Sequence, residues 1–252
     1  MSMYSKIEWT EATWNPTTGC KKISPACDNC YAETFAERFR GVKGHHYENG
    51  FDIKLWPKRL HLPLSWKKGK MIFVDSMSDL FLDEIPDGFR NSVFQTMEKA
   101  NWHTFQVLTK RPHELVEWYS QNYGLVGQEK KKLPDNVWLG VSVENNEYLF
   151  RIELLKIIPA KIKFISFEPL LGPVKLDNNL LEGINWVIVG GESGSKARRM
   201  KTEWIDDVYN ECYRLNIPFF FKQWGTYNEK GEKLGKSKSG RIYQGKEWNE
   251  MP

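Results

Sequence analysis

The sequence predicts an α/β protein with a parallel sheet, on two observations. Between Lys70 and Gly225, short apolar runs of strand length alternate with longer amphipathic runs of helix length. The short runs are rich in β-branched and aromatic residues and almost continuously apolar, which is typical of strands buried on both faces of a parallel sheet. We therefore expect a parallel (β/α) barrel or partial barrel, with a doubly wound open sheet as the alternative.

The individual elements follow from these runs. The predicted helices start at recognisable signals: Pro112 in a first turn, an asparagine cap before the helix at 146–157, and a threonine cap at Thr202. A strand at 12–15 and a helix at 31–40 extend the alternation to the N-terminus. The other predicted strands are 71–74, 104–108, 137–143, 162–167, 186–189 and 218–221, and the other predicted helices are 87–99, 112–121 and 202–215.

Length and composition indicate one sizeable domain. A chain of 252 residues with 40% hydrophobic content can bury a large core. We expect an α/β domain over residues 1–225 and a polar C-terminal tail over 226–252, because residues 228–245 are rich in Gly, Lys and Ser. The longest apolar runs have strand length, so no membrane span is expected. The first residues lack a secretory signal pattern, which predicts a cytoplasmic protein.

Three of the four cysteines lie within eleven positions, as Cys20, Cys27 and Cys30 in a C-x6-C-x2-C pattern. A reducing compartment disfavours disulfides, and a redox dithiol would leave Cys20 unexplained. Three thiolates suit a 4Fe-4S cluster, or a Cys3His zinc site with His45 or His46 as the fourth ligand. The residues alone leave both open. Cys212, on a predicted helix, is expected in the core.

Charged side chains follow six of the predicted strands. The carboxyl ends of parallel strands meet at one edge of a sheet, so we expect these side chains to converge on a site. The alternative for each residue is that a charge simply marks the exit of the strand into solvent. The glycines of Gly190-Gly191-Glu192 would let backbone amides approach a carboxylate, ribose or phosphate. The six residues are Asp75, Lys110, Glu144, Glu168, Glu192 and Lys222. Of these, Lys110, Glu144, Glu168 and Lys222 are predicted to be catalytic.

The distribution of basic residues predicts a nucleic-acid partner. The net charge is only +4, yet the positive residues are clustered along the sequence and in the C-terminal tail. Phosphate backbones favour such patches, and interleaved aromatic rings suit single-stranded or flipped bases. The alternative is a solvated lysine-rich surface over buried tryptophans. The clusters are Lys54, Lys58, Arg59, Lys67, Lys68 and Lys70, with Trp56, His61, Trp66 and Trp102 in or near them, and Lys196, Arg198, Arg199 and Lys201.

The cysteine segment resembles a known family. The string Asn15-Pro16-x-x-Gly19-Cys20, followed by Cys27-x-x-Cys30-Tyr31-Ala32, is similar to the cluster loop of radical S-adenosylmethionine enzymes, particularly the branch that includes spore photoproduct lyase. The first spacing differs, with six residues between cysteines instead of three. Most of the chain also resembles a phage- and bacteria-associated family of uncharacterised proteins that carry three such cysteines.

The resemblance implies a cofactor and residue roles. Three cysteines would bind a 4Fe-4S cluster, S-adenosylmethionine would chelate its fourth iron, and a reductant such as flavodoxin or ferredoxin would supply the electron that releases a 5′-deoxyadenosyl radical. Asp75, Ser76 and Ser78 would hold the cosubstrate, with Tyr31 against its adenine. The leading hypothesis is an enzyme that modifies or repairs nucleic acid or a nucleotide. The rivals are a non-catalytic Cys3His zinc module that binds nucleic acid or protein, and a barrel hydrolase that uses the strand-end carboxylates as acid and base.

Overall fold

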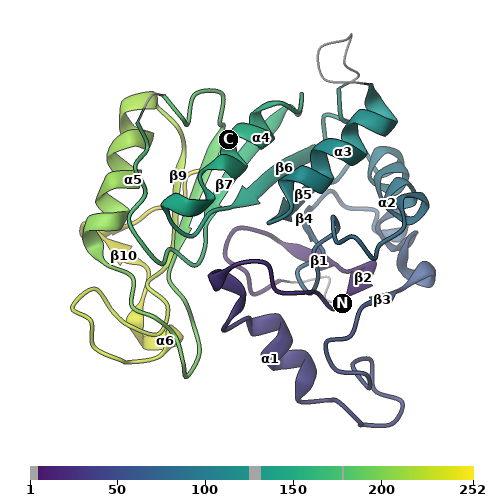
Figure 1. Cartoon of the computed structure of the whole chain (residues 1–252), viewed down its shortest axis with the longest axis horizontal. Helices are drawn as coiled ribbons and strands as arrows, with labels where there is room; N and C mark the ends of the chain where they lie inside the picture. The colour runs from purple at the N-terminus through teal and green to yellow at the C-terminus, as the bar shows by residue number, and fades with distance from the viewer. Residues whose placement is uncertain (1–4, 125–131, 178) are drawn as a thin grey trace. The chain divides into compact units, whose positions relative to one another are not determined.

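The computed structural model describes residues 5–124, 132–177 and 179–252 (Figure 1). Seven strands form one parallel sheet, in which each strand neighbours the next in chain order. A doubly wound sheet reverses its strand order at a switch point, whereas barrel strands follow one another without reversal. The order confirms the predicted partial parallel barrel. The strands, in order, are β1 (Ala12–Trp14), β4 (Met71–Val74), β5 (Thr104–Thr109), β6 (Val137–Ser142), β7 (Ile162–Phe167), β8 (Trp186–Gly190) and β9 (Phe219–Gln223).

The helices agree with the sequence pattern in most places. The predicted helix at 31–40 ends at Glu37. The predicted helix at 146–157 is divided into two helices, η4 (Asn146–Tyr148) and α4 (Phe150–Lys156). Asn145 caps the first of them, and its side chain accepts a hydrogen bond from the Glu147 amide. The predicted threonine cap is wrong, because extended Lys201 holds the cap position and Thr202 already begins the helix. The α-helices of the described residues are α1 (Tyr31–Glu37), α2 (Asp87–Lys99), α3 (Pro112–Tyr123), α4 (Phe150–Lys156), α5 (Thr202–Leu215) and α6 (Lys236–Ser239), and the 3-10 helices are η1 (Pro25–Cys27), η2 (Pro57–Arg59), η3 (Leu62–Ser65) and η4 (Asn146–Tyr148).

The chain divides into two compact units, and the division falls within β6. Unit 1 comprises Met1–Ile23, Cys30–Leu139 and Ile157–Lys161, and unit 2 comprises Ser24–Asn29, Gly140–Lys156 and Ile162–Pro252. Within the described residues, no helix combines the length and the apolar character that crossing a membrane requires.

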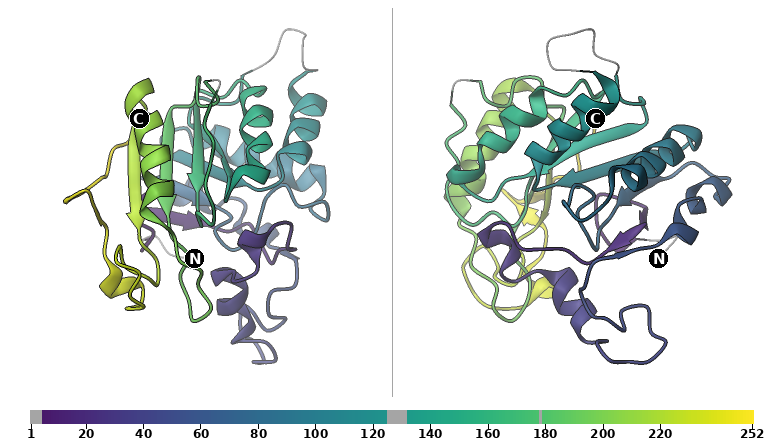
Figure 2. Two further views of the ribbon diagram at one scale, coloured as in Figure 1. Left: turned by 60° about the vertical axis from the view of Figure 1, so that its left-hand side comes forward. Right: turned by 45° about the vertical axis from the view of Figure 1, so that its right-hand side comes forward.

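Unit 1 is built on β1, β4 and β5. Helices α2 and α3 lie side by side (Figures 1 and 2), and the rings of Phe94 and Trp118 pack between them with centroids 4.1 Å apart. The spacing of Val93, Phe94 and Met97 along α2 places these buried side chains on one helical face. Trp14 of β1 is fully buried beside Phe105 of β5. This packing fixes the ends of β1, β4 and β5, where the cysteine loop begins.

Unit 2 is built on β7, β8 and β9. The buried residues Ile205, Val208 and Cys212 recur at helical spacing along α5, so Cys212 is a core residue, as expected. Along β7 the side chains alternate between the two faces of the sheet, so Ser166 lies on the face opposite that of its neighbour Phe167. Ser166 lies near the end of β7, where its hydroxyl donates to the Glu168 carboxylate.

The residues beyond 225 belong to unit 2 and pack against β9. Phe221 donates its amide to the Trp248 carbonyl at 3.0 Å, and Glu250 donates its amide to the Phe219 carbonyl at 3.3 Å. The side chains of Tyr243 and Trp248 are buried, and the Tyr243 hydroxyl lies 2.5 Å from a carboxylate oxygen of Asp206. The C-terminal segment thus covers the outer edge of β9, although its composition is polar.

Candidate functional site

The path of the chain into Cys20 is set by Gly19. Gly19 has φ of +85°, and a Cβ at this position would overlap the backbone of Asp52, so only glycine fits. The Gly19 amide donates to the Met77 carbonyl at 3.0 Å, and the Ser78 hydroxyl donates to the Gly19 carbonyl at 2.6 Å. The loop carrying Cys20 is therefore fixed to the segment that follows β4.

The same segment holds the chain that leads to Gly19. The buried carboxylate of Asp75 accepts hydrogen bonds from the amide and the hydroxyl of Thr17, at 3.1 and 2.8 Å. The Ser76 hydroxyl and the Met77 amide both donate to the side-chain oxygen of Asn15. Burial raises the pKa of Asp75 to about 7, although the hydrogen bonds from Thr17 act in the opposite direction.

These contacts bear on three residues that the sequence assigns to the cosubstrate. Asp75 is 3% exposed and bonded to Thr17, which makes it part of the support of the cysteine loop. Ser76 and Ser78 are half-buried, and their hydroxyls also bond to this loop. The structure thus brings all three together beneath Cys20. Their role toward a cosubstrate stays a prediction.

Sequence reasoning missed an arginine that contacts Cys20. One guanidinium nitrogen of Arg111, Nη1, lies 3.8 Å from Cys20 Sγ and 3.2 Å from Asp79 Oδ2. The other, Nη2, donates to the Lys21 carbonyl at 2.8 Å. Burial lowers the pKa of Arg111, but Asp79 and Cys20 outweigh this effect and raise it, so the guanidinium stays charged. The only sequence signal was a second basic residue after the β5 strand end.

Asp79 is the buried centre of this arrangement. Its two oxygens accept hydrogen bonds from the Thr109 hydroxyl at 2.7 Å, the Phe81 amide at 3.0 Å, the Lys110 amide at 3.0 Å and the Arg111 guanidinium. The carboxylate is therefore fully satisfied, as a buried charge requires. Lys110, a predicted catalytic residue, is half-buried and contributes its backbone amide to this centre.

Cys30 immediately precedes α1 in unit 1. Its carbonyl accepts hydrogen bonds from the amide and the hydroxyl of Thr34, at 3.0 and 2.9 Å, so the first turn of the helix fixes its backbone. Tyr31, predicted to lie against adenine, is 58% exposed, and its hydroxyl donates to the Ser76 carbonyl at 2.5 Å. The structure thus places Tyr31 beside the segment that follows β4.

Cys27 belongs to unit 2 and lies in the short helix η1 (Pro25–Cys27). Arg198 donates to the Pro25 carbonyl at 2.7 Å and pairs with Glu192 at 2.6 Å. The Asn29 side chain donates both to Glu192 and to the Lys196 carbonyl. Burial raises the pKa of Glu192, but the hydrogen bonds from Arg198 and Asn29 outweigh burial and lower it. Glu192, predicted to bind the cosubstrate, is ionised and anchors the Cys27 loop.

The glycines before Glu192 serve close packing. A Cβ on Gly191 would overlap the Trp224 carbonyl, and the Gly191 amide donates to the Gln223 carbonyl at 2.9 Å. A Cβ on Gly190 would meet the Glu168 carboxylate, so the glycine leaves room for that side chain. The predicted anion-binding role of this turn stays a prediction, with the Gly191 amide already engaged.

Besides Glu192, the three other predicted strand-end residues of unit 2 also form ion pairs. Lys222 lies 2.9 Å from Glu168, which also accepts a hydrogen bond from the Ser166 hydroxyl at 3.1 Å. Glu144 is completely buried and pairs with Arg151 at 2.9 Å, while its second oxygen has no hydrogen-bond partner within the described residues. Each carboxylate is therefore matched to a cation. A hydrolase mechanism with two unpaired carboxylates gains no support from this geometry.

The two histidines proposed as zinc ligands have other contacts. The His46 ring stacks on Trp56 with centroids 4.2 Å apart, and both of its nitrogens face the Arg59 guanidinium, at 2.6 and 3.0 Å. Burial, followed by the charge of Arg59, lowers the pKa of His46 to about 4. His45 stacks on Phe39 and accepts a hydrogen bond from the Tyr47 amide. Among the residues described, no three His, Cys, Asp or Glu side chains form a group that could hold a metal ion.

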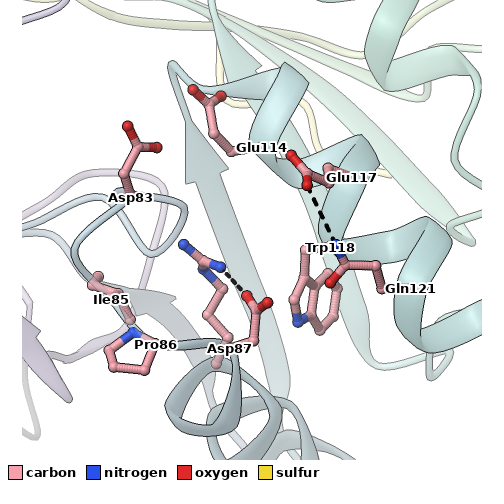
Figure 3. A pocket seen from close by; sticks show the side chains of 9 residues that line it. Asp83, Ile85, Pro86, Asp87, Glu114, Glu117, Trp118 and Gln121 are labelled. Carbon is pink, nitrogen blue, oxygen red and sulfur yellow. Dashed lines mark hydrogen bonds and ion pairs between the residues drawn. The ribbon is translucent and has the colours of Figure 1, made fainter.

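A separate depression of about 360 Å³ lies between α2, α3 and the loop that precedes α2. Figure 3 shows Glu114 and Glu117 projecting from α3, with Asp83 across from them. Asp87 pairs with Arg90, and the Gln121 side chain donates a hydrogen bond to Glu117. No residue of the predicted site lines this acidic depression.

The fold and the cysteines together define a parallel α/β protein with a three-cysteine segment after its first strand. The chain belongs to the family described as "Protein of unknown function (DUF5131)", whose model matches residues 4–252. A search of curated proteins found no match.

Two solved structures of spore photoproduct lyase are similar to the chain at 11% identity. The lyase in complex with a dinucleoside spore photoproduct matches 77% of this chain with a TM-score of 0.45, and this chain spans 58% of the length of that structure. A point mutant of the lyase matches 82% of this chain and 75% of its own length, with a TM-score of 0.49.

Proposed function

We propose that this chain is a radical S-adenosylmethionine protein in which Cys20, Cys27 and Cys30 bind a 4Fe-4S cluster, and that it modifies or repairs nucleic acid or a nucleotide. The observation that carries the proposal is the cysteine segment, whose first loop is held by the strand end after β4 and by Arg111. When bound, such a cluster supplies one electron for the reductive cleavage of S-adenosylmethionine. A flavodoxin or ferredoxin would be the electron donor.

The cysteine side chains fit a cluster by their chemistry. The three cysteines form no disulfide and are only half-buried, which suits residues that bind a metal cluster. Three thiolates are one short of the four that a closed 4Fe-4S site uses, which leaves one iron for another ligand. The guanidinium of Arg111 beside Cys20 offsets part of the negative charge that three thiolates bring. His45 and His46 have aromatic and arginine contacts, which makes the zinc alternative weaker.

The remaining residues would handle the cosubstrate and the substrate. Tyr31 presents an exposed ring that could stack on an adenine. Lys222 and Glu168 form a partly exposed ion pair that can exchange one partner for an anionic or cationic group of a ligand. Glu144 would act through Arg151, because it has no contact with solvent. Lys110 would approach the site from the end of β5.

Exposed basic and aromatic side chains support nucleic acid as the substrate class. In unit 1, Lys67 and Lys68 are exposed, and Trp102 is 43% exposed with its indole nitrogen bonded to the Trp66 carbonyl. Trp56 is less available, since the charged groups of Lys54 and Arg59 lie 4.3 and 4.1 Å from its ring. Cations beside an accessible ring suit phosphates and unstacked bases. Unit 2 adds exposed Lys196, Arg199, Lys230 and Lys233.

The decisive experiment is anaerobic purification followed by iron, sulfide and zinc assays and an absorption spectrum. The expected result is a brown protein with about four irons per chain. Replacing Cys20, Cys27 or Cys30 by Ala should abolish iron binding, whereas Cys212→Ala is the matched control and should retain it. His46→Ala should also retain iron. Stoichiometric zinc without iron would overturn the proposal.

A second experiment tests the cosubstrate. Reduced, cluster-loaded protein should cleave S-adenosylmethionine to 5′-deoxyadenosine and methionine, and calorimetry should show that Tyr31→Ala weakens cosubstrate binding. Absence of any affinity for S-adenosylmethionine in cluster-loaded protein would limit the cluster to a structural or electron-transfer role.

A further inference from the structure

We propose that Arg111, held in place by Asp79, is a positioning residue for Cys20 that also raises the reduction potential of the bound cluster. This inference rests on the proposed function, because it requires Cys20 to be a cluster ligand. It adds two residues that the cysteine pattern does not contain, and it assigns them an effect on the stability and the electronic properties of the centre.

The position of Arg111 allows it to hold the loop that carries Cys20. Arg111 makes three contacts at once, to Cys20 Sγ, to the Lys21 carbonyl and to Asp79. The first two grip both the side chain and the backbone of the cysteine loop, and the third fixes the guanidinium. Arg111 is only 6% exposed, so water does not compete effectively for these bonds.

Arg111 is itself held rigidly by its neighbours. Its own amide donates to the Thr109 hydroxyl at 2.9 Å, and that hydroxyl donates to Asp79. Asp79 therefore binds three consecutive residues at the end of β5, and it also holds the loop after β4 through the Phe81 amide. A guanidinium presents its donors in a planar fork, so a lysine could reach one of the three partners but not all of them.

The positive charge of Arg111 would also act on the bound cluster electrostatically. Reduction adds one negative charge to a cluster that thiolates already make negative, and a fixed cation nearby stabilises the reduced form. Groups that hydrogen-bond to cluster sulfurs are among the factors that set cluster potentials. Among the described residues, the other arginine near this segment, Arg198, bonds to the Pro25 carbonyl and to Glu192 and Asp28, with no bond to a cysteine. Arg111 thus directs a fixed positive charge at the sulfur of a proposed cluster ligand through a hydrogen bond.

The test uses the full chain, purified anaerobically with its cluster, as wild type, Arg111→Gln, Arg111→Lys and Asp79→Asn. The control is Arg214→Gln, since Arg214 is an ion-paired arginine on α5 of unit 2 whose side-chain bonds go to Glu211 and Asn179. Two readouts are taken: the midpoint potential from a redox titration followed by electron paramagnetic resonance, and the rate of iron loss to a chelator.

The variants separate position from charge. Arg111→Gln should lower the midpoint potential and release iron about tenfold faster, the lower end of what loss of a residue supporting a metal ligand causes. Arg111→Lys should keep most of the potential while still releasing iron faster. Asp79→Asn keeps the cation but loosens it, so iron release should quicken without a fall in potential. Arg214→Gln should match wild type in both readouts.

The outcomes distinguish this inference from the proposed function. A wild-type protein without iron refutes the proposed function and the inference with it. A wild-type protein with its cluster, and an Arg111→Gln protein that folds and has the same potential and the same rate of iron loss, refutes the inference alone. An Arg111→Lys protein that equals Arg111→Gln in potential would refute the electrostatic part.

Discussion

At the scale of single residues, Asp75 shows that a strand-end carboxylate predicted to bind a cosubstrate can also support a loop of the same site. A charge directly after a buried parallel strand can be a ligand at the sheet edge or can mark the exit of the strand into solvent, and the sequence leaves both open. In the structure Asp75 is enclosed, because Thr17 donates two hydrogen bonds to it. The sequence could not reveal this contact, since the two residues are 58 positions apart. Asp75 therefore supports the cysteine loop from inside the protein.

Burial of Asp75 predicts a pH dependence of stability. Its pKa in the folded protein is about 7, above the ordinary value of 3.8, so the folded protein binds this proton more tightly than the unfolded chain does. The contribution of this bound proton to the free energy of unfolding is complete below about pH 4, and it is lost as the pH rises through 7. Asp75→Asn, which stays neutral, should gain stability relative to wild type over this interval, by about 1.4 kcal/mol for each unit of pKa difference.

Urea unfolding of both proteins at pH 5, 6, 7 and 8 measures this difference. The comparison isolates Asp75, because every other titrating group is present in both proteins. If the free energies of unfolding of wild type and variant change in parallel with pH, Asp75 is not protonated in the folded protein and the prediction is wrong.

At the scale of elements, the sequence predicted the positions of the strands well, and it predicted side-chain contacts between distant residues poorly. Buried parallel strands are continuous apolar runs, so β4 and β7 coincide with their predicted ranges. The threonine cap was wrong because cap geometry depends on one backbone angle that composition does not reveal. The cysteines and the strand-end charges were visible as patterns. The Arg111 and Asp79 pair was missed, since pairing across 32 positions depends on tertiary distance.

The η1 segment gives a prediction at the element scale. Glu192 pairs with Arg198, which bonds to the Pro25 carbonyl before Cys27. Glu192 also accepts a hydrogen bond from the side chain of Asn29, which follows Cys27. Glu192→Ala should therefore loosen η1 and increase the rate at which Cys27 is alkylated in metal-free protein. Cys20 has its own support and should react at the wild-type rate.

Alkylation by iodoacetamide, followed by mass spectrometry of the separate cysteine peptides, measures both rates in one experiment. Glu203→Ala is the matched control, because this glutamate is exposed in the first turn of α5. Equal acceleration at Cys20 and Cys27 would indicate general unfolding and contradict a local role for Glu192.

At the scale of the whole molecule, exposed basic side chains are clustered in each of the two units, and clustered cations favour a polyanionic partner. We expect single-stranded oligonucleotides to bind with an affinity that falls as salt rises. Replacing the exposed Lys67 and Lys68 by Ala should reduce the slope of log affinity against log salt by about 1.4, which corresponds to two lost phosphate contacts. Trp102→Ala should weaken binding through lost stacking.

Fluorescence anisotropy at several salt concentrations, with single- and double-stranded oligonucleotides, provides the measurement. Alanine replacements at Lys161 and Lys175, which are also exposed but lie outside the predicted clusters, should leave the slope unchanged. A protein that binds neither oligonucleotide at low salt would exclude nucleic acid as the substrate class.

The pairing of the C-terminal segment with β9 has a consequence for self-association. β9 ends the strand order and presents three consecutive phenylalanines, Phe219 to Phe221. An exposed edge strand of this composition is a template for pairing with a second chain. Residues 248–250 occupy the backbone hydrogen bonds of that edge. A chain that lacks residues 226–252 would therefore expose the aromatic edge strand β9, and we expect it to aggregate by pairing of this edge with a second chain.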